Sequence, residues 1–495
     1  MGIKKEKLCK NTVSVIDAFQ NQCYNSNGFI DATTKRRKHM KKKVALALAS
    51  TMMVSAVAMS GCGNSGNAQQ PAQETKAAET QAAAPAEGAS GDALHLTFYY
   101  PVNVGGDAAK LIEKICGDFN AENPDIVVEP VYTGNYDDTV TKIQTAMQGG
   151  TPPDVFVSLA TQRFTMASTG MAMPLDDLIA ADGDEGKAYI DDFLDGFMED
   201  SYVDGKIYSI PFQRSTEILY YNKDAFKEVG LDPEKAPESW DELVEYGKKL
   251  TNENRYGVGI ALNSGSAQWT FTGFCLQNSV NGENLATEDG KQALFNTPEN
   301  VEALQFWLDL QNEHKIMAEG IVQWTDLPTQ FLAGEVAMIY HTTGNLANIS
   351  KNAEFEFGTA FLPGNKRMAA PTGGGNFYIS SGLPEERVQA AWKFIKFATE
   401  PERAAQWALD TGYVATRESC YETDLLKKYY EELPQAKTAY EQIAVSKPEL
   451  TTYNAAEMWR ILNDNIQAAV VGDATAAEAM ANAQEEADAV LEEYQ

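Results

Sequence analysis

The sequence of 495 residues has few of the side chains from which catalytic and metal sites are commonly built. It contains only four histidines, and its six cysteines are scattered with no Cys-x-x-Cys spacing. It has neither a His-Glu-x-x-His pattern nor a Gly-x-Ser-x-Gly pattern, so neither a zinc protease nor a serine-hydrolase elbow is indicated. We therefore expect no metal site, no cofactor and no dense disulfide framework.

Positive charge is also scarce. The 40 Lys and Arg residues stand against 70 Asp and Glu residues, which gives a formal net charge of −30. A chain this acidic is unsuited to electrostatic binding of nucleic acid or anionic lipid. The many carboxylates leave a secreted glycosidase open as an alternative, because such enzymes act through a pair of acidic side chains.

A long apolar run is missing as well, although a short one follows the basic residues Lys41 to Lys43. The apolar residues 44–58 fall short of the ~20 that span a bilayer, and small residues precede a cysteine, as in a secretory signal peptide. Met59-Ser60-Gly61-Cys62 resembles a bacterial lipobox. By that resemblance Cys62 carries a lipid and begins the mature chain; a plain signal peptide with a free cysteine is the alternative.

The segments around this signal are expected to lack a fold. Residues 1–39 match no targeting design, and we expect Met40 to be the true start and 1–39 to be a mis-called extension. Residues 40–61 are then the signal peptide. Residues 62–92 are rich in Ala, Gln, Glu, Gly and Pro, so they cannot bury enough apolar surface to fold and are expected to form a disordered tether.

Strands and helices alternate after the tether. Apolar runs predict strands over 94–100, 126–132 and 154–159, with amphipathic helices between them. This order implies a parallel sheet with right-handed crossovers. Solutes bind such sheets at the carboxyl ends of the strands, which here are the loops at 101–106, 134–136 and 160–163.

The rest of the chain is organised around residues 206–233. Ile207–Phe212 and Glu217–Tyr221 are predicted strands, and a capped helix follows that ends at Gly230. The polar patch Gln213–Thr216 lies between the two strands. We interpret it as a crossing between two lobes with hydroxyls facing a cleft; a simple strand-turn-strand in another α/β protein is the alternative.

This stretch resembles the extracellular solute-binding proteins of ATP-binding-cassette importers, in the branch that carries sugars and glycerol phosphates. The resemblance rests on Pro-Phe, Ser-Thr, Tyr-Tyr-Asn-Lys and Gly-Leu-Asp-Pro within 211–233. Phe-Asn-x-x-Asn-Pro-Asp, Tyr-x-Gly-Asn-Tyr and Gly-x-x-Pro-Asp-Val match earlier in the chain. Together the motifs cover nearly all of Leu94 to Gln495.

The resemblance implies an α/β fold of the two-lobed, periplasmic-binding-protein-like kind (type II). Each lobe is expected to be a mostly parallel sheet flanked by helices, and hinge crossings join the two. Residues 93–212 and 342–380 are expected to form the first lobe, and residues 213–341 and 381–495 the second. The implied mechanism is closure of both lobes around one solute.

The same resemblance places solute contacts on seven residues: Tyr136, Ser215, Trp269, Gly344, Gly373, Tyr413 and Arg460. Trp269 follows a strand and a Gly/Ser loop, where an indole suits the C–H face of a sugar; a core tryptophan is the alternative. Gly373 is expected in a loop. Arg460 suits phosphate, carboxylate or paired hydroxyls, and a surface salt bridge is its alternative.

Two positions depart from the family pattern. Ala415 stands where a proline is expected, and none of Leu159, Ala160 and Thr161 supplies the glutamate that holds glycerol hydroxyls in the glycerol-phosphate branch. We therefore expect a monomeric, lipid-anchored receptor on the outer face of the cell membrane that passes a sugar to permease subunits and is not an enzyme. Binding of sn-glycerol 3-phosphate or glycerophosphodiesters is the alternative.

Overall fold

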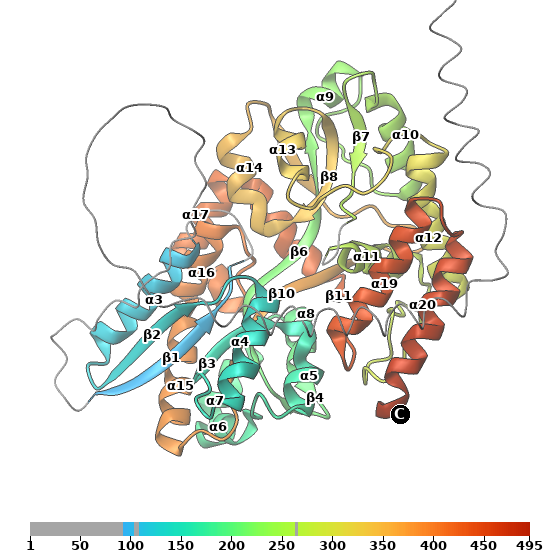
Figure 1. Ribbon diagram of the computed structural model, residues 1–495. Coiled ribbons are helices and arrows are strands. Elements are labelled where there is room, and N and C mark those ends of the chain that lie inside the picture. Colours follow the sequence, from blue (N-terminus) through green and yellow to red (C-terminus); the bar gives the residue numbers. More distant parts are fainter. Residues whose placement is uncertain (1–92, 103–107, 263–265) are drawn as a thin grey trace, which may run out of the picture. The chain divides into compact units, whose positions relative to one another are not determined.

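The computed structural model describes residues 93–102, 108–262 and 266–495 (Figure 1). The chain divides into two compact units, Met1–Pro85 and Ala86–Gln495, and all described residues belong to the second. The expected extension 1–39, signal peptide 40–61 and tether 62–92, with Cys62, lie outside the described residues. Those assignments stay predictions.

Within the described residues, one nine-stranded sheet follows the order β2-β1-β3-β10-β6-β8-β7, with β11 beside β10 and β9 beside β6. Its strands are β1 (Leu94–Tyr100), β2 (Ile126–Tyr132), β3 (Val155–Leu159), β6 (Ile210–Asn222), β7 (Tyr256–Gly259), β8 (Val336–Thr342), β9 (Phe357–Ala360), β10 (Ala370–Ile379) and β11 (Ser446–Pro448). A separate ribbon pairs β4 (Tyr202–Val203) with β5 (Lys206–Ile207).

The alternation at the start of the fold is as predicted. β1 pairs in parallel with both β2 and β3, and α3 (Ala108–Glu122) and α4 (Tyr136–Gln148) make the crossovers. α3 buries Ile112, Cys116 and Phe119 on one face, as its helical spacing requires. The position of Cys116 on this face predicts a core residue, and the structure confirms it, because the cysteine is free and buried.

The strand β6 corrects the reading of residues 206–221. It is one continuous strand whose thirteen residues are all buried, not two strands separated by a polar break. Its first half pairs with β10, and its second half pairs with β8 and β9. Figure 1 shows β6 running from the neighbourhood of β10 to that of β8. The polar side chains stay in the strand because buried partners from distant segments satisfy them.

The strand β10 corrects a second expectation, that residues 372–376 form a loop. They lie inside the strand, antiparallel to β3 and to β6, with a register shift between Gly375 and Asn376. Glycines usually weaken a strand because they offer no side chain to pack. Here they persist because aromatic side chains occupy the space above them, as described below.

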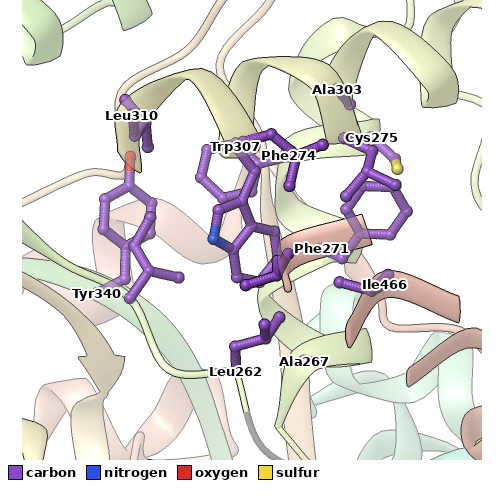
Figure 2. Close-up of a cluster of buried hydrophobic side chains, with 14 of the residues drawn as sticks. Leu262, Ala267, Phe271, Phe274, Cys275, Ala303, Trp307, Leu310, Tyr340 and Ile466 are labelled. Atoms are coloured by element: carbon purple, nitrogen blue, oxygen red, sulfur yellow. The ribbon is translucent and has the colours of Figure 1, made fainter. Parts of the chain in front are cut away.

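Two large apolar clusters stabilise the fold. The first gathers around β1, β3 and α3 and includes α15 (Glu385–Ala398). The second gathers α10 (Trp240–Leu250), α11 (Ala267–Asn278), α12 (Pro298–Asn312), α19 (Ala455–Val470) and α20 (Ala476–Leu491) against β8. Figure 2 shows part of it, where Phe271, Phe274 and Trp307 meet Tyr340. Each fully buried large side chain contributes about 1.5–3 kcal/mol.

Some segments pack in a different apolar cluster from the one that the expected lobe boundaries predict. Trp392 and Phe394 of α15 lie in the first cluster with Phe98, whereas residues 381–495 were all expected in the second lobe. β9 pairs with the second half of β6, although residues 342–380 were expected in the first lobe. The chain therefore crosses between the clusters more often than sequence order suggests, and the lobe boundaries remain a proposal.

The remaining helices are short. They are α5 (Arg163–Ser168), α6 (Asp176–Ala181), α7 (Gly183–Asp191), α8 (Asp195–Met198), α9 (Lys223–Glu228), α13 (Leu327–Leu332), α14 (Leu346–Asn352), α16 (Pro401–Thr411), α17 (Asp424–Glu432) and α18 (Lys437–Ile443). In the described part of the chain, no helix combines the length and the apolar character needed to cross a bilayer.

The sequence also predicts helix starts at Ser239, Thr297 and Thr475, and the structure confirms them. Each of these side chains accepts a hydrogen bond from a backbone N–H of the first turn. The pair Thr399 and Glu402 predicts a further capping box, and this prediction is wrong: α16 begins after Glu400, and the Thr399 hydroxyl donates to the carbonyl of Ile395 at 2.8 Å.

Candidate functional site

The candidate site is built on the central part of two neighbouring strands. In the antiparallel register of β6 and β10, Ser215 lies opposite Gly373 and Gln213 lies opposite Gly375. Successive residues of a strand point to opposite faces, so these four positions share one face of the sheet. The two glycines leave the strand surface open there, and aromatic side chains from other elements fill the space.

Trp269 lies directly over Gly373. A Cβ atom at Gly373 would lie 2.9 Å from Cε2 and Cζ2 of the indole ring, so only glycine allows this approach. Trp269 lies in the first turn of α11 and is partly exposed. Its Nε1 is buried and has no hydrogen-bond partner among the described residues. The indole thus offers a ring face and an unused donor beside Ser215 and Gly373.

Tyr136 occupies the matching position over Gly375. A Cβ atom there would lie 2.9 Å from the Tyr136 hydroxyl, and that hydroxyl donates to Gln213 Oε1 at 3.0 Å. Asn135 fixes the tyrosine at the start of α4, because its side chain accepts from the backbone N–H of Asp138 in a capping box. Burial, and then the neighbouring Tyr413, raise the pKa of Tyr136, so its hydroxyl stays protonated.

Tyr413 closes this side of the cluster. It follows Gly412, whose φ of 86° belongs to the left-handed region that glycine tolerates. The Tyr413 ring stacks on Trp407 with centroids 6.0 Å apart. A Cβ atom at Gly412 would lie 2.7 Å from the carbonyl oxygen of Thr343, the residue before Gly344. The segment carrying Gly344 is therefore packed against the segment carrying Tyr413.

The structure does not bring Arg460 to this cluster. Arg460 lies inside α19, and its side chain is half exposed. Its guanidinium bonds Glu457 at 2.7 Å and Asp464 at 2.7 Å, both on the same helix. These contacts correspond to the surface salt bridge that was the alternative reading of this residue.

Sequence reasoning missed an arginine network centred on Arg214, which points to the opposite face of β6 from Gln213 and Ser215. Arg214 is fully buried, and its guanidinium donates to Asp200 Oδ2 at 2.9 Å and to Asn376 Oδ1 at 3.1 Å. Arg163 donates to the other oxygen of Asp200 at 2.6 Å. A buried charge persists only with such partners. The available signal was a charged residue in a polar stretch flanked by apolar residues on both sides.

Glu217, which also lies within the buried strand β6, was not singled out from the sequence either. The Thr270 hydroxyl donates to its Oε1 at 2.6 Å, and Oε2 has no hydrogen-bond partner in the part of the chain that the structure describes. Burial raises the pKa of Glu217 to about 8. Because Thr270 follows Trp269, this carboxyl group lies close to the candidate site and links β6 to α11.

A second tryptophan extends the aromatic surface. The rings of Trp269 and Trp324 have centroids 5.6 Å apart, and Trp324 stacks on His341 at 3.8 Å. Asn345 donates to His341 Nδ1 at 2.9 Å, and burial lowers the pKa of His341 to about 3. His341 is therefore neutral and positions Trp324; it is unsuited to accepting protons at neutral pH.

The arrangement is suited to binding a solute. Rings of Trp269, Tyr136 and Tyr413 border a strand surface with hydroxyl and backbone groups at Ser215 and Gly373. Such a surface can stack on a sugar ring and bond its hydroxyls. No group of three or more His, Cys, Asp or Glu side chains is placed to hold a metal within 93–102, 108–262 and 266–495.

Comparison with known families decides what kind of protein carries this site. Residues 114–438 match the family described as bacterial extracellular solute-binding protein. The chain belongs to this family. Its members are extracytoplasmic receptors that bind solutes, and the α/β fold of type II periplasmic binding proteins expected from the sequence is confirmed.

Individual members of this solute-binding family resemble the chain over most of its length. The sn-glycerol-3-phosphate-binding periplasmic protein UgpB of Escherichia coli (strain K12) is 28% identical over 410 residues, which is 79% of this chain and 91% of that protein. UgpB from Mycobacterium tuberculosis, solved with glycerophosphocholine, is 26% identical with a TM-score of 0.70, covering 81% of this chain and 98% of that one.

A sugar-binding member resembles this solute-binding protein equally well in structure. Maltose-bound MalE3 of T. maritima is 25% identical with a TM-score of 0.68, covering 80% of this chain and 100% of that one. The comparisons therefore include both a glycerophosphocholine complex and a maltose complex. They establish the receptor family and leave the solute to be argued from the site.

Proposed function

We propose that this protein is an extracytoplasmic receptor that captures a sugar or oligosaccharide and delivers it to the permease of an ATP-binding-cassette importer. Membership of the solute-binding family supports the receptor role. The observation that carries the sugar assignment is the indole of Trp269 lying over the bare strand at Gly373, with Tyr136 over Gly375 beside it. This pair of rings flanks a line of hydrogen-bonding groups, as recognition of a sugar requires.

Each site residue has a proposed role. Trp269 stacks on a sugar ring, and Tyr136 and Tyr413 wall the solute. Ser215 and the backbone at Gly373 and Gly344 bond its hydroxyls. Arg460 is left out of this set, because its guanidinium is held by Glu457 and Asp464.

A glycerol phosphate is the second candidate solute. The UgpB proteins that resemble this chain favour it, since their names state sn-glycerol 3-phosphate and one is solved with glycerophosphocholine. The engagement of Arg460 with two carboxylates speaks against a phosphate grip at that residue. The two candidates are separable by direct binding measurements.

The receptor is proposed to release its solute unchanged. A glycosidase would need two carboxyl groups set across one bond, with one acting as acid. Of the buried carboxyls near the candidate site, Glu217 is held by Thr270. Incubating a bound oligosaccharide with pure protein and analysing the products tests this part: unchanged sugar is expected, and shorter products would reveal an enzyme.

The lipid anchor is also proposed. Cys62 after Ser60-Gly61 resembles the acceptor of a bacterial lipobox, and a lipid there would hold a monomeric receptor beside its permease. Metabolic labelling with a fatty acid is expected to mark the protein and to fail for Cys62→Ser. Equal labelling of both proteins would contradict the anchor.

A thermal-shift screen tests the proposed function. The panel holds neutral mono-, di- and oligosaccharides, sn-glycerol 3-phosphate and glycerophosphocholine. A saccharide is expected to raise the melting temperature, because a ligand that binds only the folded state stabilises it. Trp269→Ala is expected to abolish the shift, whereas Tyr256→Ala, an exposed aromatic outside the cluster, is expected to keep it. No shift with any panel member would contradict the proposal.

A further inference from the structure

A pocket of about 810 Å³ lies next to the candidate site. Its lining comes from α5, from the loop around β4, from residues 281–289 and from the segment that follows β11. A volume of this size suits a ligand of one or two sugar rings. None of the seven residues singled out from the sequence lines it.

Two chain connections join the pocket to the aromatic cluster. Pro448, the last residue of β11, pairs with Thr372, so Glu449 directly follows this strand pair on one side and Gly373 follows it on β10. The side chain of Gln268, which precedes Trp269, lies close enough to the Glu449 carboxyl to oppose the rise of its pKa. Glu449, which belongs to the pocket lining, is therefore next to residues that neighbour Gly373 and Trp269 along the chain.

Two buried polar side chains line this pocket, and each has one polar atom without a hydrogen-bond partner among the described residues. Glu449 is 5% exposed and Arg163 is 7% exposed, and both belong to the pocket lining. Glu449 Oε2 and Arg163 Nε have no hydrogen-bond partner within the described ranges. An unpaired buried polar atom is unfavourable, so a ligand that supplies the missing partner gains that interaction.

An aromatic wall stands beside these groups. Phe164 stacks on Tyr453 with ring centroids 4.9 Å apart, and the Arg163 guanidinium lies 4.6 Å from the centroid of Phe164. Phe164 lines the pocket, as does the half-exposed Tyr202. Ring surface next to an acid and a guanidinium is a combination that suits a sugar, whose faces are apolar and whose edge carries hydroxyls.

The rim of the pocket is acidic. Its exposed charged residues are Glu199, Asp204, Glu283, Glu288 and Asp289, and the half-buried Lys447 lies beside them. Lys447 is paired with Glu199 at 2.7 Å, so the uncompensated charge at the rim is negative. Such a rim repels a phosphate group and leaves an uncharged ligand unaffected.

We propose that this pocket extends the solute site and takes the uncharged, hydroxyl-rich end of an oligosaccharide, with Glu449 and Arg163 as its specificity-determining residues. The inference rests on the proposed receptor function and narrows the solute to a neutral saccharide of more than one ring. One ring lies against Trp269 and Tyr136, and the next enters the pocket. Glu449 and Arg163 there bond neighbouring hydroxyls, one through a carboxyl oxygen and the other through Nε–H.

The protonation of Glu449 agrees with this role. Burial raises its pKa well above the ordinary value, and the carboxylates of Asp200 and Glu217 raise it further, while Arg214 and Gln268 oppose them. A carboxyl group that keeps its proton can donate to one hydroxyl oxygen and accept from another hydroxyl. It also adds no negative charge against the solute.

Isothermal titration with the saccharide that gives the largest thermal shift tests the inference on the full folded chain. Glu449→Ala, which removes both carboxyl oxygens, is expected to weaken binding at least tenfold, whereas Glu449→Gln, which can still donate and accept, is expected to weaken it less. Glu288→Ala makes the same truncation on the exposed rim of the same pocket, and its affinity is expected to stay within twofold of wild type. Tyr202→Ala alters the exposed wall without touching the buried network and is expected to weaken binding severalfold, even if Glu449→Ala folds poorly.

The outcomes separate this inference from the function on which it rests. If Trp269→Ala loses binding while Glu449→Ala and Tyr202→Ala bind as wild type, the pocket is not part of the site and the receptor function stands. If sn-glycerol 3-phosphate binds more tightly than every saccharide, the proposal that this pocket takes an uncharged solute is also contradicted. If no panel member binds wild type, the proposed function fails and this inference fails with it.

Discussion

Two buried regions of this protein differ in polarity: one is apolar and the other is polar. The second apolar cluster packs Phe271, Phe274 and Trp307 in the interior between helices (Figure 2). The crossing of β6 buries five consecutive polar residues, 213–217, and leaves atoms such as Glu217 Oε2 without a partner among the described residues. The first region stabilises the fold. The second costs stability, and it borders the surface on which we place the solute.

The largest expected effect comes from breaking the apolar region. Phe274→Ala removes a fully buried ring that contacts Trp307 and Tyr340, and we expect the free energy of unfolding to fall by about 3–5 kcal/mol. Denaturant unfolding measures this loss. Solute affinity of the remaining folded protein is expected to stay within twofold.

Val280→Ala is the control for this prediction, because Val280 is 73% exposed and its loss should cost less than about 0.5 kcal/mol. A Phe274→Ala protein as stable as Val280→Ala would contradict the role assigned to the cluster.

The second-largest effect on stability is expected when the buried carboxyl group of Glu217 is replaced. Burial raises its pKa from 4.5 to about 8, so between these values the folded state holds a proton that the unfolded state has lost. The stabilising contribution of this group is therefore complete below about pH 4.5 and disappears as the pH rises through 8. Glu217→Gln should gain stability at pH 8 relative to wild type, on the order of a few kcal/mol.

Melting curves from pH 5 to pH 9 check this sign. Glu449 and Tyr340 lie close enough to Glu217 to couple with it. The pH dependence of the melting temperature therefore reports on these three side chains together and not on Glu217 alone. Glu253→Gln, an exposed carboxylate, should leave the profile unchanged. A Glu217→Gln profile parallel to wild type would show that this carboxyl does not hold the proton.

A smaller effect is expected where the two strands carry the site. Gly373→Ala drives a Cβ atom into the Trp269 ring, at 2.9 Å before relaxation, and overpacking of this kind costs about 1–3 kcal/mol. Displacing the indole should also weaken solute binding about tenfold, which titration calorimetry measures. In α3, Gly117 has open space around its Cβ position, so Gly117→Ala should leave binding unchanged. Equal affinities for both variants would remove Gly373 from the site.

The smallest effect is expected at Arg460. Its ion pairs with Glu457 and Asp464 lie on an exposed helix surface, where such pairs contribute about 0–1 kcal/mol. Arg460→Ala is therefore expected to change stability by less than ~1 kcal/mol and to leave solute affinity unchanged. A tenfold loss of affinity would return Arg460 to the site.

The sequence predicted regular elements well because they depend on local patterns. The parallel arrangement of β1, β2 and β3 and the buried face of α3 followed from apolar spacing alone. The caps at Ser239 and Thr475 followed from side chains three residues apart. Each of these features is decided by neighbours along the chain.

The crossing was predicted less well because its partners are distant. Gln213–Thr216 looked like a break between strands, yet Arg214 is satisfied by Asp200 and Asn376. Gly373 looked like a loop residue, yet Trp269 fills the space above it. Hydrophobic periodicity contains no information about such partners, so it cannot separate a buried polar strand from a polar turn.

The site residues also divide into those that local motifs predicted and those whose role depends on distant partners. Aromatic residues singled out from the family motifs, Tyr136, Trp269 and Tyr413, lie in or beside the crossing. Arg460 is taken up by carboxylates on its own helix, which spacing alone did not decide. Glu449 carried no signal at all, because its significance depends on the pocket that α5 and residues 281–289 form around it.

A crystal structure of the protein with the saccharide that gives the largest thermal shift tests the central claim most directly. The account predicts a sugar ring stacked on Trp269 within about 4 Å of the indole, with Tyr136 and Ser215 in contact with the same solute. A saccharide bound elsewhere, with the surface between Trp269 and Tyr136 untouched, would contradict it.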